Sequence, residues 1–290
     1  MQHNLSISPR NVYLASPTQH GDTEWGQDVA RELSSSIRDS PACGARARWA
    51  RWNLVCRALY RAWRYRLKIE RQEIRFLRRT IRPGQTVVDV GAHKGAFTYW
   101  MHRSVGRSGQ VIAFEPQAEL ADHLVRVSRA LGIDEVAVVS CALSSRSGTA
   151  TLVRPVGRPS PGATITSRKG QNEEIVSVQV NTLDDFFLEH PRRPIRFIKC
   201  DVEGHEHDVF RGGVRILRED RPILLFECER RHHPQRQIDH VFRLLEGLGY
   251  EGYFFAGPRG VLRPLCDLGE AQLNNPESKR YTRNFVFLPR

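Results

Sequence analysis

The sequence lacks several features that would mark a membrane-spanning or secreted protein. None of its hydrophobic runs approaches the ~20 consecutive apolar residues that a membrane-spanning helix requires. Its first 20 residues lack the charged-then-apolar layout of a signal peptide. The six cysteines are scattered without a C-x-x-C pair, which argues against a zinc knuckle and against a disulfide framework. We therefore expect a cytoplasmic protein with reduced thiols.

Acidic residues are scarce in one part of the chain, and this scarcity divides the sequence. The net charge is +12 over 290 residues, but residues 46–82 hold 13 Lys and Arg against two acids, a local excess of +11. The rest of the chain is therefore close to neutral. We expect a flexible leader at 1–45, a basic helical extension at 46–82 and one catalytic domain at 83–290.

The basic extension has the spacing of an amphipathic helix over 48–79. From Arg57 to Arg78, basic residues follow one another at alternating intervals of four and three residues. Apolar residues from Trp52 to Leu77 keep a similar rhythm on a second face. The sequence Arg82-Pro83-Gly84 then ends the pattern, because proline disfavours the helical conformation of the residue before it.

Three interpretations of this extension stay open at the level of sequence. Its aromatic and basic faces suit a peripheral contact with an anionic membrane, at the inner membrane face. Its row of arginines could instead bind RNA phosphates, although the chain shows no recognisable RNA-binding module and its remainder is nearly neutral. The third interpretation packs Trp52, Leu59 and Trp63 against the catalytic domain and leaves the arginines in solvent.

After Gly84 the sequence alternates short apolar runs with helical patterns. The runs "TVVDVG", "QVIAFEP", "EVAVVSCAL", "IRFIKCDVEG" and "RPILLFECE" are typical of buried strands, and helices are expected at 96–105 and 118–131. The runs "GTATLV" and "IVSVQV" add a β-rich excursion before the fourth of these strands. This βαβ order predicts an α/β fold: a doubly wound, Rossmann-like, mostly parallel sheet with helices on both faces.

The stretch "TVVDVGAHKGAFT" indicates a ligand-binding turn between a strand and a helix. Gly91 and Gly95 frame the turn, and we expect the missing β-carbon of Gly91 to let a ligand approach the backbone. The turn is no dinucleotide fingerprint, because that motif requires glycine where His93 stands, and it is no P-loop. Asp89 at the strand end suits a ligand with a positively charged group.

Glu115, at the tip of the next strand, narrows the choice of ligand. A carboxylate at this place can accept two hydrogen bonds from a ribose diol, and Pro116 ends the strand behind it. Together, the ammonium partner Asp89 and the ribose partner Glu115 point to S-adenosylmethionine (SAM) as cofactor.

The most polar cluster of the chain, "IKCDVEGHEHDVF", follows the fourth strand and carries the candidate catalytic residues. Ligands bind at the carboxyl ends of strands in open α/β sheets, so Asp201 and Glu203 should face cofactor and acceptor. With His205, and with Glu227 at the end of the fifth strand, they are the available general bases for a hydroxyl nucleophile.

Two further expectations concern this part of the chain. Asp201 and Glu227 could share a divalent cation such as Mg²⁺. Two carboxylates alone are no metal signature, however, so no metal ligand is predicted. Glu206 and Asp208 are expected in the solvated first turn of a helix, where acids favour the positive end of the dipole.

The motifs together resemble the FkbM family of SAM-dependent methyltransferases. The resemblance covers residues 84–288 and rests, in order, on "VVDVGAHKGAFT", "VIAFEP", "VVSCALSSRSGTATL", "VNTLDDFF", "IRFIKCDVEGHEHDVFRGG", "ILLFECE", "LEGLGY" and "NFVFLP". It implies the class I methyltransferase fold with its seven-stranded sheet. It also implies O-methylation, often of a sugar hydroxyl in a glycolipid, a surface polysaccharide or a natural product.

The resemblance also assigns the cofactor-binding residues. It places Asp89, Gly91 and Gly95 at the methionine end of SAM, Glu115 at the ribose, Cys141 and Ala142 at the adenine side, and Asp201 beside the transferred methyl group; His93 and Pro116 complete the set. The family commonly has asparagine where this chain has His93. A non-catalytic protein of the same fold is the alternative of a different class, and the joint presence of Asp89, Glu115 and Asp201 argues against it.

Overall fold

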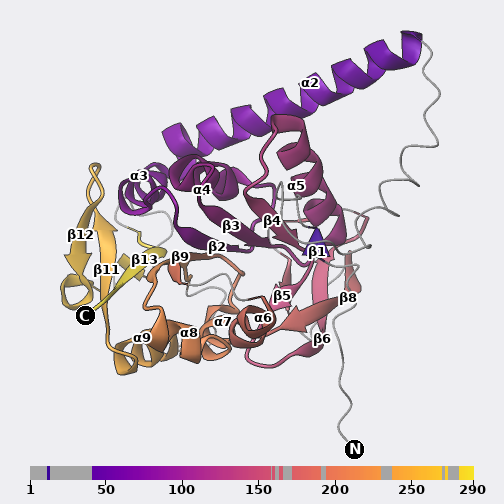
Figure 1. Ribbon diagram of the computed structural model, residues 1–290. Helices are drawn as coiled ribbons and strands as arrows, with labels where there is room; N and C mark the ends of the chain where they lie inside the picture. The colour runs from indigo at the N-terminus through magenta and orange to yellow at the C-terminus, as the bar shows by residue number, and fades with distance from the viewer. Residues whose placement is uncertain are drawn as a thin grey trace, which may run out of the picture.

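The computed structural model describes residues 12–13, 41–157, 159–160, 163–165, 172–190, 194–229, 237–269, 272–273 and 281–290. The centre of the fold is a nine-stranded sheet with helices on both faces (Figure 1). Its strand order is β1-β4-β3-β2-β9-β10-β13-β11-β12. No helix in these ranges is long and apolar enough to cross a membrane.

Five neighbouring strands of this sheet run parallel: β4 (Val136–Val139), β3 (Gln110–Phe114), β2 (Thr86–Val90), β9 (Ile195–Cys200) and β10 (Ile223–Glu227). Strand β13 (Asn284–Pro289) lies antiparallel between β10 and β11 (Tyr250–Ala256). The seven strands from β4 to β11 form the predicted mostly parallel sheet. Two short strands extend it at the edges, β1 (Val12–Tyr13) and β12 (Val261–Pro264).

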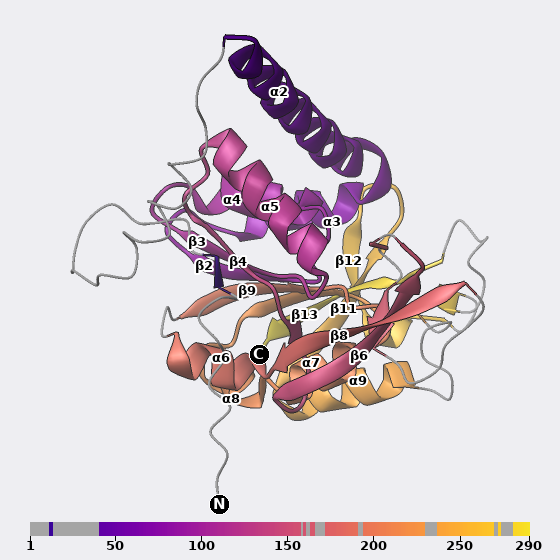
Figure 2. The same ribbon diagram turned by 90° about the vertical axis from the view of Figure 1, so that its right-hand side faces the viewer.

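Helices cover the two faces of the sheet, as the predicted βαβ order requires (Figures 1 and 2). One face carries α3 (Arg71–Thr80), α4 (Ala96–Val105) and α5 (Ala118–Leu131); the other carries α6 (Leu183–Glu189), α7 (Glu206–Arg211), α8 (Val214–Glu219) and α9 (Gln237–Gly247). The helices predicted at 96–105 and 118–131 are confirmed at both ends. A single 3₁₀ turn, Leu265–Asp267, follows β12.

Each face of the sheet has its own apolar core, because successive side chains of a strand point to opposite faces. Val87 and Val88, adjacent on β2, are both fully buried and belong to different cores. A strand of this kind reads as a continuous apolar run, which is why "TVVDV" predicts a central parallel strand.

The predicted β-rich excursion forms a second, four-stranded sheet in the order β5-β8-β6-β7. Its strands are β5 (Ala142–Leu143), β6 (Gly148–Pro155), β7 (Thr164–Ile165) and β8 (Glu173–Asn181). Figure 2 shows β6 and β8 as a pair of long strands outside the main sheet.

The N-terminal extension departs from the single helix predicted over 48–79. Helix α2 (Pro41–Arg64) continues into one π-helical turn, Tyr65–Ile69, and the chain then turns at Glu70 before α3 begins. Glu70 has φ −117° and ψ 54°, which are not helical. Its carboxylate accepts hydrogen bonds from Arg283 at 2.7 Å and from Asn284 at 3.0 Å. These distant partners fix the break, so a local spacing pattern could not reveal it.

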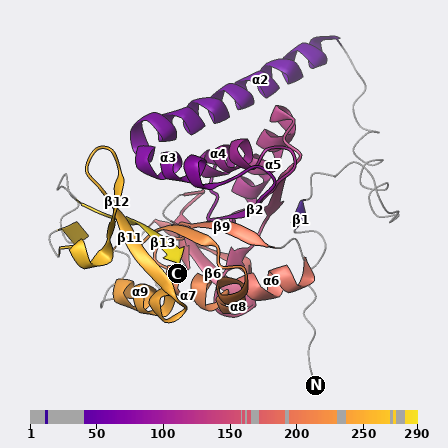
Figure 3. The same ribbon diagram turned by 60° about the vertical axis from the view of Figure 1, so that its left-hand side comes forward.

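Helix α2 begins earlier than the predicted extension and reaches past the rest of the molecule. Its C-terminal part lies against α4 and α5, whereas its N-terminal part projects from the body (Figures 1 and 3). Apart from β1 and the start of α2, the predicted leader at 1–45 lies outside the described residues.

Candidate functional site

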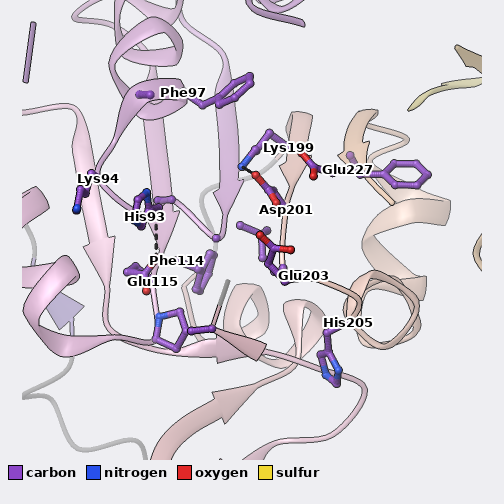
Figure 4. A pocket seen from close by; sticks show the side chains of 18 of the residues that line it. His93, Lys94, Phe97, Phe114, Glu115, Lys199, Asp201, Glu203, His205 and Glu227 are labelled. Carbon is purple, nitrogen blue, oxygen red and sulfur yellow. Dashed lines mark hydrogen bonds and ion pairs between the residues drawn. The ribbon is translucent and has the colours of Figure 1, made fainter. Parts of the chain in front are cut away.

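A cavity of about 250 Å³ lies where β2, β3, β9 and β10 end, the place at which open α/β sheets bind ligands. Ten of the predicted site residues line it: Gly91, His93, Glu115, Pro116, Cys141, Ala142, Asp201, Glu203, His205 and Glu227. The other two, Asp89 and Gly95, lie behind this wall. Figure 4 shows His93 and Glu115 on one side of the cavity and Lys199, Asp201, Glu203 and Glu227 on the other.

The turn after β2 has a backbone that few residue types adopt. Gly91 and Gly95 have φ of +75° and +78°, and His93 lies between them with φ +48°. The left-handed region favours glycine and asparagine, which agrees with the asparagine that the FkbM resemblance leads one to expect at His93. A β-carbon on Gly91 would overlap the carbonyl oxygen of Asp201. The carbonyl that follows β9 therefore also requires glycine at this position, while Gly91 itself lines the cavity.

Replacing Gly91 by alanine should lower the free energy of unfolding by about 3 kcal/mol or more, because backbone strain and the overlap with Asp201 act together. Gly132 offers a matched control: its φ is +65°, and a β-carbon there would meet nothing within 4 Å. Gly132→Ala should therefore cost only the strain, about 1–2 kcal/mol. Urea unfolding of both variants measures the difference; equal losses would contradict the contact with Asp201.

Glu115 is almost completely buried at the tip of β3. Its carboxylate accepts hydrogen bonds from the backbone N–H groups of His93, at 2.8 Å, and of Gln117, at 3.0 Å. Burial raises the pKa of Glu115 to about 7, and these two hydrogen bonds work against the rise. The carboxylate thereby ties the turn after β2 to the tip of β3.

Lys199 occupies the centre of the opposite wall. Its Nζ lies 3.1 Å from Asp201 Oδ2, 3.8 Å from Asp89 Oδ1 and 4.9 Å from the ring centre of Phe97. Burial disfavours the ammonium, but the two carboxylates outweigh burial and hold the pKa of Lys199 above its usual range. Asp89 is fully buried, and its second oxygen accepts a 2.6 Å hydrogen bond from Thr98. Asp89 therefore acts on the cavity through Lys199.

Glu227 belongs to an acidic cluster around one guanidinium. Arg283 lies 2.7 Å from Glu70, 3.4 Å from Glu229 and 3.6 Å from Glu227. Burial raises the pKa of Glu227 to about 9 and that of Glu70 to about 8, while Arg283 lowers both. Because one cation faces the two buried carboxylates of Glu70 and Glu229 and the largely buried Glu227, the cluster retains a proton at neutral pH.

A family model matches the part of the chain that carries most of this site. The model of the FkbM methyltransferase domain matches residues 89–251, which is more than half of the chain. The chain belongs to the FkbM family of methyltransferases. A comparison with curated proteins gives no match.

Several solved structures are similar to this member of the FkbM family. An FkbM methyltransferase from Methylobacillus flagellatus KT has 16% identity and a TM-score of 0.46, with 91% of this chain and 60% of that chain covered. A SAM-dependent O-methyltransferase from Thermotoga maritima has 15% identity and a TM-score of 0.40, with coverage of 74% and 63%. Cofactor-bound Rv0187 from MTB has 16% identity and a TM-score of 0.43, with coverage of 93% and 98%. The chain thus spans less than two thirds of the length of the first two.

The surroundings of His205 and Glu206 were not evident from the sequence "IKCDVEGHEHDVF". The Nε2 atom of His205 is 2.9 Å from the hydroxyl of Ser144, and burial lowers the pKa of the ring. Figure 4 shows the ring directed away from Asp201. Glu206 does begin α7, as predicted, but it is buried rather than solvated, and it accepts a hydrogen bond from the N–H of Gly204 at 3.1 Å.

Basic side chains lie beside two of the candidate catalytic carboxylates of this FkbM protein. Lys199 contacts Asp201, and Arg283 contacts Glu227. No group of three or more His, Cys, Asp or Glu in the described part of the chain is arranged to hold a metal ion.

Several lining residues of the FkbM site were not predicted as site residues. Lys199 appears in the polar cluster without a role, yet a lysine inside the buried strand "IRFIKC" is a signal, since lysine is almost never fully buried unless it is paired. The N-terminal extension supplies Arg61, Tyr65, Ile69, Glu70 and Glu73, and β13 with the residue before it supplies Asn284 and Arg283. Glu70 and Glu73 are the two acids of an otherwise basic segment, which was the available signal for them.

Proposed function

We propose that this cavity is the active site of a SAM-dependent O-methyltransferase whose acceptor is a sugar hydroxyl, in a glycolipid, a polysaccharide or a natural-product glycoside. The observation that carries the proposal is the placement of Glu115 and Asp201 in one cavity, at the tips of strands on either side of β2, in a chain of the FkbM family. The sugar is the part that rests on the family resemblance alone.

Three parts of SAM have candidate partners in the cavity: the ribose, the adenine and the carboxylate. Glu115 would hold the two ribose hydroxyls, and Cys141 with Ala142 would border the adenine. The carboxylate of the methionine part would find Arg61, Lys94 and His93, whose Nε2 is buried without a hydrogen-bond partner among the described residues. Burial, together with the charges of Lys94 and Arg61, lowers the pKa of His93 to about 4, so its ring is neutral at pH 7.

The protein's share of the reaction is alignment and proton removal. Bound SAM supplies an electrophilic methyl group on a sulfonium. Asp201 is the proposed general base, because it lines the cavity, its side chain is 31% exposed, and Lys199 Nζ holds its Oδ2 at 3.1 Å. Glu227, whose pKa burial raises to about 9, would donate a hydrogen bond to the acceptor when it holds the proton of this cluster. Glu203 lines the same wall and would position the acceptor.

Titration calorimetry with SAM tests the cofactor, and we expect binding with one site per chain. Incubation with methyl-labelled SAM and separate extracts of glycans, glycolipids and RNA then tests the acceptor, with label expected in a glycan or glycolipid fraction. Absence of SAM binding would overturn the proposal. Label in RNA would favour an RNA methyltransferase, and SAM binding without transfer to any extract would favour a non-catalytic protein.

A further inference from the structure

The outer face of α2 exposes an unusual row of aromatic side chains. Trp49 is 72% exposed, Trp52 67%, Tyr60 71% and Trp63 44%. At ~100° per residue these four and Cys56, which is also exposed, fall within about 80° of the helix circumference. We call these five residues the aromatic stripe. Leu67, in the π-helical turn, is also exposed.

Most of the aromatic stripe points away from the rest of the protein; Trp63, at its C-terminal end, also packs edge-on against Trp100 of α4, with ring centres 5.2 Å apart. On the opposite side of α2, Ala62 is buried and its carbonyl accepts a 2.8 Å hydrogen bond from the indole of Trp100. Arg51, on the same side, donates to the carbonyl of Ala130 at 3.0 Å. The interpretation that packs Trp52, Leu59 and Trp63 against the catalytic domain is therefore wrong for Trp52, whereas Trp63 does contact that domain through Trp100. Contiguous apolar surface of this kind marks an interaction site.

Charge on α2 indicates the kind of partner. The helix contains six arginines and no acidic residue. Arg46, Arg57 and Arg64 fall along one border of the aromatic stripe and Arg48 along the other, and all four are exposed. Apolar and aromatic residues flanked by arginines along ~28 Å of helix are the layout of a helix that lies in the headgroup region of an anionic bilayer.

We propose that α2 docks on an anionic lipid surface through the aromatic stripe, with the flanking arginines at the headgroups. Trp and Tyr favour the interface between headgroups and acyl chains, and basic residues are attracted by the negative potential of the lipids. RNA phosphates would use the arginines but leave most of the aromatic stripe in water.

Docking would also bring the cavity close to the bilayer. The same segment runs from the aromatic stripe into the cavity wall, where Arg61, Tyr65 and Ile69 line the site. If methyl transfer is the function, which this step takes from the proposed function, the favoured acceptor is a sugar carried on a lipid. The docking itself does not depend on that activity.

Flotation of the full-length protein with vesicles tests the docking without any substrate. Vesicles of phosphatidylcholine are compared with vesicles that contain about one third phosphatidylglycerol. We expect the protein to float with the anionic vesicles only. The variant Arg46→Gln/Arg48→Gln/Arg57→Gln should bind about 100-fold more weakly, and Trp49→Ser/Trp52→Ser/Tyr60→Ser at least ~10-fold more weakly.

Matched controls separate the aromatic stripe from general surface properties. Arg211→Gln/Arg218→Gln/Arg243→Gln removes three exposed charges from α7, α8 and α9, on the other face of the sheet (Figure 1). Ile175→Ser/Leu188→Ser/Val261→Ser removes three exposed apolar side chains far from α2 in sequence. Both controls should float like the wild type, with unchanged thermal melting in every variant.

Each outcome of the flotation experiment either supports or overturns the docking of α2. Selective loss of flotation in the two α2 variants supports the docking, as does a blue shift of tryptophan fluorescence on addition of anionic vesicles that Trp49→Ser/Trp52→Ser abolishes. Flotation equal in wild type and α2 variants overturns it. The docking is also overturned if the protein fails to float but binds RNA through the same arginines. It is likewise overturned if the protein sediments as a dimer that the serine variants dissociate. Failure of SAM binding would leave these results unchanged.

Discussion

Replacing Asp201 by asparagine should lower the turnover number for methyl transfer by about 10²–10⁴-fold, the usual contribution of a general base. Asparagine keeps the size of the side chain but cannot take the proton of the acceptor hydroxyl. Lys199 would retain Asp89, 3.8 Å away, as an ionic partner, so the wall of the cavity should stay in place. Initial rates at saturating labelled SAM, with an extract that accepts the methyl group, measure the loss.

Asp208→Asn is the matched control for this variant. Asp208 is a second aspartate of the same segment, but it accepts a 2.8 Å hydrogen bond from Ser145 and does not line the cavity. Its turnover should stay within a factor of about 3, a surface-type effect of less than ~1 kcal/mol. Calorimetry should give both variants nearly the wild-type affinity for SAM. A wild-type rate in Asp201→Asn would remove Asp201 from the role of base.

Local patterns predicted those parts of the structure that neighbouring residues determine. Helix α5 ends where Gly132 adopts a left-handed conformation, and α4 ends at Gly106, so both boundaries were readable from the sequence. The tips of β3 and β9 carry Glu115 and Asp201, and parallel strands bring both to one edge of the sheet. This part of the candidate site could therefore be placed before its contacts were known.

Features that depend on distant residues could not be read in the same way. The turn at Glu70 is fixed by Arg283, 213 residues further along the chain. The space beside Gly91 is taken by the carbonyl of Asp201, which no spacing near Gly91 encodes. Helical periodicity placed Trp52 on an apolar face correctly, but it could not say whether that face meets the protein or solvent. Burial is a property of the assembled fold.

Replacing Glu115 by alanine should weaken SAM binding by about 10²–10³-fold, because hydrogen bonds to a charged group contribute about 1.5–3 kcal/mol each and the ribose offers two hydroxyls. Turnover at saturating SAM should change little, since Glu115 is expected to contact the ribose and not the reacting atoms. Calorimetry gives the affinity. Glu119→Ala is the control. Glu119, on α5, pairs with Arg154 of β6 outside the cavity wall, and its loss should leave SAM affinity within a factor of about 3.

The pH dependence of binding tests whether Glu115 supports SAM binding in its ionised form. Burial raises the pKa of this carboxyl to about 7, so the empty site holds a proton there below neutral pH and loses it above. The ionised form is the better acceptor for the ribose hydroxyls. SAM affinity should therefore be highest above pH 7 and fall by up to about tenfold per pH unit below it, as the fraction of ionised Glu115 falls. Calorimetry between pH 5.5 and 8.5 should show this inflection, at about the pKa of Glu115, in the wild type and in Glu119→Ala. The inflection should vanish in Glu115→Ala; an inflection that persists there would come from another group and would contradict the role of ionised Glu115 in binding.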